Sequence, residues 1–353
     1  MTQDSPALSF NNLGAAHNQG LRAALALSLA HGRAITFQGL KDDTPHPRPG
    51  LGAASLNLLA ALARLSQGAF SGVTGEEEGS FTPGRPRGGQ YNLSLSALRF
   101  SEAPLSWMLE AAALSCLQLE EDLCLLVSGG GTHVFGGPTS EEVSQLILPL
   151  WARAGLKASY SEIAPGFHPN AGGEVEIIIE PCQNLTALEL IGSFVPQTLG
   201  VEAVSADLPS YLMENALEAV RERISRHRLP DPLTSLRRPL SGHGQSLLLW
   251  ADNGKWRLGF SVTGRKGTPL NSLAAQTVEE LVAFLGSGAS LPSRQALWCL
   301  PLLSLAGGVS RIQVDRDEQP LRAAVQVLNR FRPGSALLLP WQENFLLQVQ
   351  GGD

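Results

Sequence analysis

Long apolar runs, cysteines and an excess of basic residues are all scarce in this chain of 353 residues. No run of eighteen apolar residues occurs and the N-terminal segment is polar, so we predict neither a transmembrane helix nor a signal peptide. The four cysteines have neither zinc-ligand spacing nor a disulfide pattern, which favours free thiols, no metal site and a reducing, cytoplasmic location. They are Cys116, Cys124, Cys182 and Cys299.

Basic residues do not predominate. Lys and Arg together number 26 against 32 Asp and Glu, and the net charge is −6. Nucleic-acid-binding proteins usually carry a basic excess, so this balance argues against extensive phosphate contact but allows a local pocket for one terminal phosphate. We predict no DNA and no membrane as partners. The chain is 43% hydrophobic and 16% charged, which suits a sizeable core in one large domain or two.

A pattern of helix, strand, helix and strand occurs three times, beginning near Leu21, Leu105 and Arg294. The first two copies start 84 residues apart and the last two 189, so about a hundred residues are most simply an inserted domain. We predict an α/β (α+β) fold, with a three-repeat domain over residues 1–183 and 288–353 and a smaller α/β insert over 184–287. The predicted helices are 20–31, 51–66, 105–117, 139–154, 209–227, 272–285, 294–305 and 320–331. The predicted strands are 34–38, 70–73, 123–128, 158–162, 187–191, 246–251, 256–262, 310–314, 336–339 and 344–349, with hairpins over 80–95 and 166–179.

Residues 126–174 carry the densest local signals. A buried-type strand runs into the glycine turn 129–131, followed by Thr132 and His133. A helix then opens with the capping-box pair Thr139 and Glu142, and its apolar residues repeat at helical spacing. Gly155 is placed where a C-terminal cap glycine belongs. A GFHP turn and a second glycine pair follow before the next strand.

This order of motifs resembles the RNA 3′-terminal phosphate cyclase family. Members carry a GGT turn, a helix ending near LPLL-x-x-x-G, and then GF-Y-P-x-GGGE. Here the last two read LPLWARAG and GFHPNAGGE, and the departures include His168 and Ala171. The match is specific over about fifty residues and weaker over nearly the whole chain. It implies the same layout of three repeated α/β units with an insert between the second and third.

The resemblance also implies a reaction. The family uses ATP to make a 2′,3′-cyclic phosphate at an RNA 3′ end. A histidine attacks the α-phosphorus and carries AMP, the AMP passes to the RNA 3′-phosphate, and the neighbouring 2′-hydroxyl displaces it. This chemistry needs an imidazole nucleophile, cations that hold phosphates and a carboxylate for the metal.

The positions that carry the family's catalytic residues differ here from the family pattern. The histidine that opens the last helix is replaced by Gln319, whose carboxamide has no usable lone pair for attack on phosphorus, and no histidine follows His243. In the N-terminal motif, Gln19 and Arg22 match, but Ala15 replaces the metal-site glutamate.

The other motifs are also incomplete. The PGL after Arg48 is kept, but the two arginines of that motif do not match and its glutamine-histidine pair falls on 54–55. Asn271 stands where the insert has a glutamate, whereas Arg87 and its two glycines match.

Six residues remain as candidate contacts to an RNA phosphate or a nucleotide. They are Gln19, Arg22, Arg48, Arg87, His133 and, more weakly, His17. The alternatives are structural: His133 as a turn residue, Arg22 in a surface salt bridge, and His17 in a turn. A metal site formed by His17 and His133 together is a further alternative, but the prediction is that the protein has no metal site.

Three hypotheses follow. The first is a catalytically inactive cyclase-like protein, acting in RNA 3′-end binding or RNA processing and requiring no cofactor. The second is an active cyclase using ATP and Mg²⁺, with His17 or His133 as a relocated nucleophile. The third is a regulatory subunit that binds a protein partner.

Overall fold

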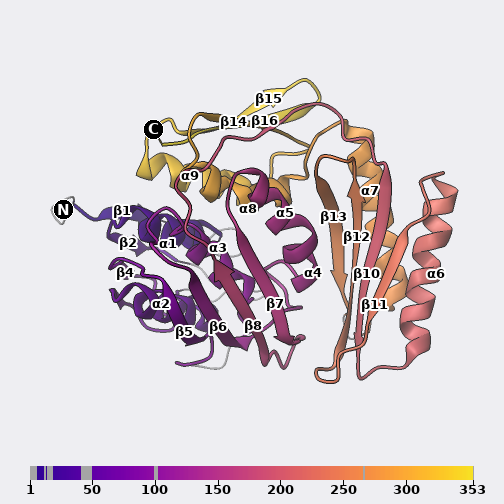
Figure 1. Cartoon of the computed structure of the whole chain (residues 1–353), viewed down its shortest axis with the longest axis horizontal. Coiled ribbons are helices and arrows are strands. Elements are labelled where there is room, and N and C mark those ends of the chain that lie inside the picture. The colour runs from indigo at the N-terminus through magenta and orange to yellow at the C-terminus, as the bar shows by residue number, and fades with distance from the viewer. Residues whose placement is uncertain are drawn as a thin grey trace.

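The computed structural model describes residues 6–11, 13, 19–40, 50–98, 102–264 and 267–352. Within these residues the strands form four sheets of four strands each, and helices pack between and beside them (Figure 1). The predicted mixed α+β class is therefore confirmed. In the described part of the chain, no helix is both long enough and apolar enough to cross a membrane.

The first repeat forms a sheet of order β1-β2-β4-β3. Its elements are β1 (Leu8–Asn11), α1 (Gln19–His31), β2 (Ile35–Gln38), α2 (Ala53–Ser66), β3 (Ala69–Ser71) and β4 (Gly79–Thr82). β1 and β2 are parallel, and the other pairs are antiparallel. Helix α1 is buried on all sides from Gln19 to Leu29, as expected for a helix with alanine and leucine on every face.

The second repeat forms a sheet of order β5-β6-β8-β7. Its elements are β5 (Gly89–Ser94), α3 (Ser106–Ala113), β6 (Leu123–Gly130), α4 (Ser140–Glu142), the π-helical segment η1 (Val143–Ile147), α5 (Leu148–Arg153), β7 (Ala158–Ala164) and β8 (Gly173–Ile179). The hairpin predicted over 80–95 is wrong, because β4 pairs with β2 and β3 whereas β5 pairs in parallel with β6. The Pro- and Gly-rich residues between them connect two sheets. The hairpin predicted over 166–179 begins one strand earlier, because β7 pairs antiparallel with β8 and residues 166–172 join the two strands.

The predicted insert contains a sheet of order β11-β10-β12-β13, with α6 and α7 packed together on one side (Figure 1). Its elements are β10 (Thr198–Ala206), α6 (Ser210–Arg226), β11 (Leu233–Arg237), β12 (Gly244–Asp252), β13 (Arg257–Thr263) and α7 (Leu270–Ser287). The sequence did not indicate β10 or β11. All five residues of β11 are exposed on the sheet edge, so this strand has no alternating apolar pattern.

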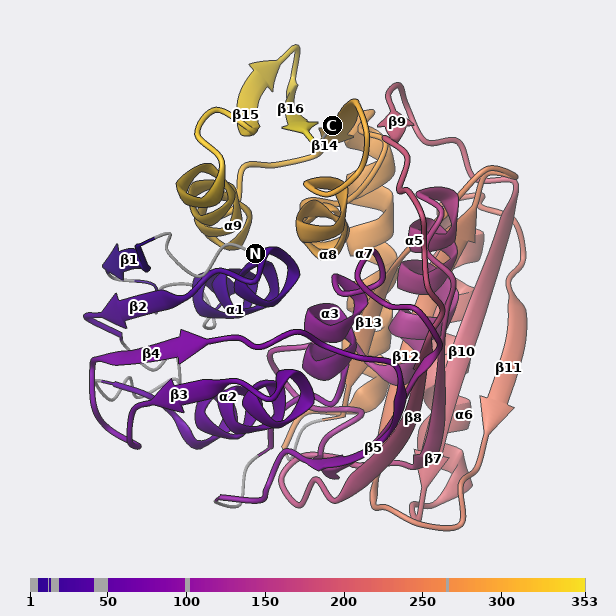
Figure 2. The same ribbon diagram turned by 60° about the vertical axis from the view of Figure 1, so that its left-hand side comes forward.

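The third repeat forms a sheet of order β15-β16-β14-β9. Its elements are β9 (Glu189–Leu190), α8 (Ser293–Leu303), β14 (Val309–Val314), α9 (Gln319–Phe331), β15 (Ala336–Trp341) and β16 (Asn344–Gln350). The strand predicted near 187–191 was assigned to the insert, but β9 pairs in parallel with β14. This correction concerns one strand, and the boundaries at 184 and 287 stay predictions. Helices α1, α3 and α8 lie centrally, among the sheets (Figure 2).

The four cysteines are free thiols, as predicted. Cys116 and Cys299 are buried, and Cys124 and Cys182 are half-buried. Burial raises the pKa of both the Cys116 and the Cys299 thiol to about 12. Because the thiolate is the reactive form, these two cysteines are unreactive near neutral pH.

Candidate functional site

Gln319, at the position predicted for the nucleophile, is the first residue of α9 and is exposed. It lines a groove of about 630 Å³ between α9, β1 and the start of α1, where Gly20 contributes to the wall. Two arginines of α9 also line this groove. Arg322 donates two hydrogen bonds of 2.5 Å to Asp317, and Arg330 donates to the backbone carbonyl of Ser9 at 2.8 Å.

Gln19 and Arg22 lie in the interior, at the start of α1. The Arg22 Nη2 atom is 3.0 Å from a Glu110 carboxylate oxygen on α3 and 2.5 Å from Gln19 Oε1. Its Nη1 atom donates to the carbonyl of Gly136 at 2.8 Å. The predicted alternative of a salt bridge is therefore observed, although it is buried and not on the surface.

Two tryptophans enclose the same guanidinium. Its central carbon lies 4.8 Å from the ring centre of Trp107 and 5.2 Å from that of Trp298. Burial lowers the pKa of Arg22, and the charge and hydrogen bond of Glu110 oppose this shift. Both Nη groups are engaged by protein atoms, whereas the buried Nε atom has no hydrogen-bond partner among the described residues.

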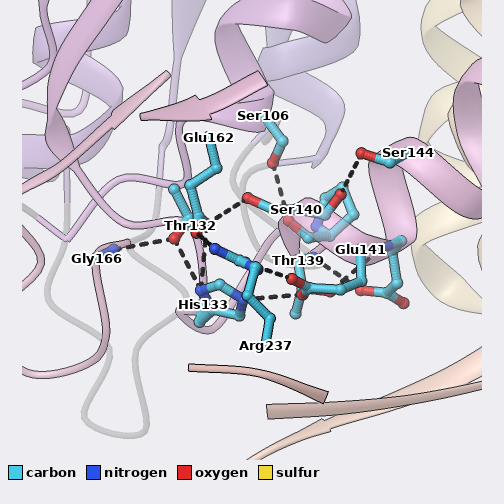
Figure 3. Close-up of polar contacts among 12 residues, drawn as sticks. Ser106, Thr132, His133, Thr139, Ser140, Glu141, Ser144, Glu162, Gly166 and Arg237 are labelled. Atoms are coloured by element: carbon cyan, nitrogen blue, oxygen red, sulfur yellow. Dashed lines mark hydrogen bonds and ion pairs between the residues drawn. The ribbon is translucent and has the colours of Figure 1, made fainter. Parts of the chain in front are cut away.

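His133 is completely buried beyond the end of β6. Its Nδ1 atom lies 2.8 Å from Thr132 Oγ1, and its Nε2 atom lies 2.8 Å from Glu141 (Figure 3). Its ring stacks on Phe167, with centres 4.5 Å apart. Both ring nitrogens thus have protein partners, and the side chain does not reach the Gln319 groove.

Phe167 belongs to the GFHP turn and extends this packing to the predicted insert. It clusters with Val204 and Ala206 of β10. It also explains Gly244 at the start of β12, because a Cβ atom there would lie 2.4 Å from a Phe167 ring carbon. The GFHP turn therefore packs His133 against the β10–β12 sheet.

Arg237, on the exposed edge strand β11, binds two buried carboxylates of the second repeat. Its Nη2 atom donates to Glu141 at 2.8 Å and its Nη1 atom donates to Glu162 at 2.5 Å (Figure 3). Ser140 donates to the other oxygen of Glu162 at 2.7 Å. We call His133, Ser140, Glu141, Glu162 and Arg237 the Arg237 network.

Electrostatics keep Glu141 and Arg237 of this network charged. Burial alone would raise the pKa of Glu141, but the charges and hydrogen bonds of His133 and Arg237 outweigh it and lower the pKa to about 2. Burial lowers the pKa of Arg237, and the two carboxylates outweigh it, so the net shift is upward. The sequence singled out His133 but not Glu141, Glu162 or Arg237, whose separation in the chain hides their pairing.

The structure confirms two predicted helix-end features near the network, the capping box of 139–142 and the cap glycine at 155. The Thr139 hydroxyl accepts a hydrogen bond from the Glu142 backbone N–H at 3.2 Å, and the Glu142 carboxylate accepts one from the Thr139 N–H at 2.9 Å. This is the predicted capping box. Gly155 has a φ of +96° just after α5, which suits a glycine at the end of a helix. The capping box fixes the start of α4 and with it the position of Glu141.

The remaining candidates are not brought together. Arg87 is exposed just before β5, whereas His133 follows the far end of the parallel strand β6. The length of β6, at about 3.3 Å per residue, separates them by roughly 25 Å. Arg48 and His17 lie outside the described residues. Ala15, the counterpart of the family's metal-site glutamate, lies outside them as well. Among the residues that are described, no group of three or more His, Cys, Asp or Glu could hold a metal ion.

Comparison with known proteins places the chain in a family. Residues 14–335 match the model of the RNA 3′-terminal phosphate cyclase family. An RNA 3′-terminal phosphate cyclase of Methanothermobacter thermautotrophicus is 28% identical over 81% of this chain and 83% of its own length. The RNA 3′-terminal phosphate cyclase of Methanopyrus kandleri is 26% identical over 91% of this chain and 92% of its own length. That of Salmonella agona is 27% identical over 91% of this chain and 90% of its own length. The extent of the family match, together with the repeats and the GGT, capping-box and GFHP motifs, shows that the chain belongs to the RNA 3′-terminal phosphate cyclase family.

Proposed function

We propose that this protein is a catalytically inactive member of the cyclase family that binds RNA 3′ ends and acts in RNA processing. The observation that carries the proposal is Gln319, exposed at the start of α9 on the groove wall. The resemblance puts the family's nucleophilic histidine at this position. Losing a covalent nucleophile costs many powers of ten in rate, and a carboxamide cannot take its place.

The surroundings support the loss of the reaction. Arg22 matches a family position, but Glu110 neutralises it inside the protein. The groove arginines Arg322 and Arg330 are held by Asp317 and the Ser9 carbonyl. The carboxylates of Glu110 and Asp317 balance the charges of Arg22 and Arg322, which weakens the stabilisation that these two arginines could give to charge developing on a transferred phosphoryl group.

The groove itself supports binding. Amide side chains of Asn11, Gln319 and Gln326 line it, whereas the amide of Asn329, also on the wall, is bonded to the Ala336 backbone. Amides both donate and accept hydrogen bonds, as the hydroxyls and base edges of a terminal nucleotide require.

An active cyclase with a relocated nucleophile is the rival within the same family, and it would need ATP and Mg²⁺. His133 is a poor nucleophile because Thr132 and Glu141 hold its two ring nitrogens and its surface is completely buried. His17, the other candidate nucleophile, lies outside the described residues.

One observation favours a protein-binding role as a second candidate. Leu337, Leu339 and Trp341 alternate along the edge strand β15 and are 41%, 42% and 42% exposed. Exposed apolar side chains gathered on one strand are typical of a contact surface for another protein.

The test is an adenylation assay. The purified protein is mixed with Mg²⁺, ATP labelled on its α-phosphate and a short RNA ending in a 3′-phosphate, beside an active cyclase from the family. We expect no labelled protein and no cyclic RNA end. Label that disappears in the His17→Ala or His133→Ala variant would overturn the proposal and identify the nucleophile.

Binding is measured separately with the same RNA at several salt concentrations. We expect binding that weakens with salt, because phosphate contacts release counterions. Absence of RNA binding at low salt, together with absence of adenylation, would favour the protein-binding candidate.

A further inference from the structure

Another hollow, of about 400 Å³, lies away from Gln319, between the end of α5 and the turn that joins β12 to β13. Arg153, the last residue of α5, lies on one side. Lys255 and Trp256 of the turn lie on the other. The two sides touch, since Arg153 Nη1 donates to the carbonyl of Lys255 at 2.8 Å.

The charges in this hollow do not cancel. Its one carboxylate, Asp252, is 2.8 Å from Arg257 Nε and pairs with that arginine. Arg257 also donates to Gln145 at 2.6 Å and lies over the Trp250 ring at 4.3 Å, so it is held in the structure. Arg153 and Lys255 are both exposed, and neither forms an ion pair with any described residue. Two positive charges therefore converge on the hollow in a chain whose net charge is −6.

The turn that carries Lys255 is rigid. The Asn253 side chain accepts hydrogen bonds from the N–H groups of Lys255 and Trp256 at 3.0 and 2.9 Å. The Trp256 indole donates to the Ser290 carbonyl at 3.0 Å. The Arg153 guanidinium lies 6.0 Å from the Trp256 ring centre and keeps its Nε and Nη2 donors for a ligand.

Helix chemistry alone does not account for this arrangement. An arginine in the last turn of a helix is favoured by the helix dipole, which would explain Arg153 by itself. Lys255 comes from a different element, separated from Arg153 by more than a hundred positions. The dipole does not explain why cations from two different elements line one hollow beside the Trp256 ring.

We propose that Arg153, Lys255 and Trp256 form a second RNA contact, which binds backbone phosphates of the strand upstream of its 3′ end. The inference rests on the proposed RNA-binding function and extends it from the terminal nucleotide to the body of the strand. Cations that hold phosphates next to an aromatic ring are the usual means of binding a single strand without sequence preference.

The test compares affinities for a twelve-nucleotide single-stranded RNA ending in a 3′-phosphate. We expect the Arg153→Ala, Lys255→Ala double variant to bind more weakly. Each phosphate contact on a single strand contributes about 0.7 to the magnitude of the slope of log K against log salt. Loss of two contacts should therefore reduce that magnitude by about 1.4 and weaken binding about 25-fold at 0.1 M salt.

Two control variants separate charge from fold. Arg64→Ala with Arg311→Ala removes the same charge from two exposed arginines on α2 and β14, and we expect a change of less than about threefold. The exchange Arg153→Lys with Lys255→Arg keeps the charge and should retain most of the affinity. Thermal melting of each variant checks that the fold is unchanged.

Each outcome is decisive. If the wild-type protein binds the RNA and the Ala double variant binds equally well, the second contact is wrong and the proposed function stands. If the wild-type protein binds no RNA, the proposed function and this inference both fail. If free inorganic phosphate at low millimolar concentration abolishes the difference between the two proteins, the hollow is a site for small anions and not for the strand.

Discussion

The guanidinium of Arg22 and the carboxylate of Glu110 form an ion pair of 3.0 Å in the interior, with each side chain only 4% exposed. Arg22 matches the family's N-terminal motif, and here its charge is balanced within the protein. A buried pair of this kind resists removal of one partner much more than removal of both, because a lone buried charge has lost its hydration without compensation.

We therefore expect Glu110→Leu, which leaves Arg22 buried without its partner, to lower the free energy of unfolding by about 3–5 kcal/mol. Arg22→Met combined with Glu110→Leu should cost less than the two single changes added together. Urea unfolding of the four proteins gives the coupling energy directly, and Arg64→Ala on the exposed face of α2 serves as a control expected within about 0.5 kcal/mol of wild type. Additive single changes would show that the pair is not coupled.

Restoring the nucleophile should not restore the reaction. In the Gln319→His variant an imidazole would stand at the first residue of α9, on the groove wall. Arg22 would still be bound to Glu110, and position 15 would still be an alanine. We expect no AMP on the variant in the adenylation assay. Labelled protein, stable to alkali and labile to acid as a phosphoramidate is, would show that the rest of the ATP site is intact.

Much of the fold was visible in the sequence because its signals are local. The capping pair Thr139 and Glu142, three positions apart, predicted the start of a helix, and apolar spacing predicted most other elements. The hairpin over 80–95 was wrong because turn residues are the same whether they join two strands of one sheet or two sheets. Strand β11 gave no signal because an exposed edge strand needs no apolar face.

The candidate site was less visible for a related reason. Arg22 and Glu110 are 88 positions apart, and Arg237 and Glu141 are 96 apart. Nothing in the residues near Arg22 shows that a glutamate of α3 neutralises it. A motif match reports which residue is present, whereas burial and long-range pairing decide whether its charge is available.

The Arg237 network should make the free energy of unfolding fall at acidic pH. The folded pKa of Glu141 is about 2, below the ordinary value of 4.5, so this carboxylate stabilises the folded state fully above about pH 5. That contribution, on the order of 3 kcal/mol, is lost as the pH falls from about 5 to 2.

Glu141→Gln should remove this dependence. We expect urea unfolding of the variant to change less steeply with pH between 5 and 2 than that of the wild type. Glu218→Gln, on the exposed face of α6, removes an equivalent charge and should leave the wild-type slope unchanged. Equal slopes in all three proteins would mean that Glu141 is not held ionised by the network.

Arg237 should also hold β11 against the second repeat. In Arg237→Ala, the carboxylates of Glu141 and Glu162 lose their shared partner, and since Arg237 is 42% exposed we expect a loss of about 1–3 kcal/mol and not the full cost of a buried pair. Amide hydrogen exchange should speed up in β11 and in the segment from Thr132 to Glu141. It should stay unchanged in α1, which packs elsewhere.

Two further variants show whether geometry or charge holds the strand. Arg238→Ala removes the neighbouring exposed arginine and should leave exchange at the wild-type rate. Arg237→Lys keeps the charge, but an ammonium is a single point of donation and cannot bridge the two carboxylates as a guanidinium does. We therefore expect Arg237→Lys to fall between wild type and Arg237→Ala. If β11 in Arg237→Lys exchanges as slowly as in the wild type, charge alone fixes the strand. If β11 in Arg237→Ala also exchanges at the wild-type rate, the packing of Phe167 against β10 and Gly244 is enough to hold the insert sheet against the second repeat.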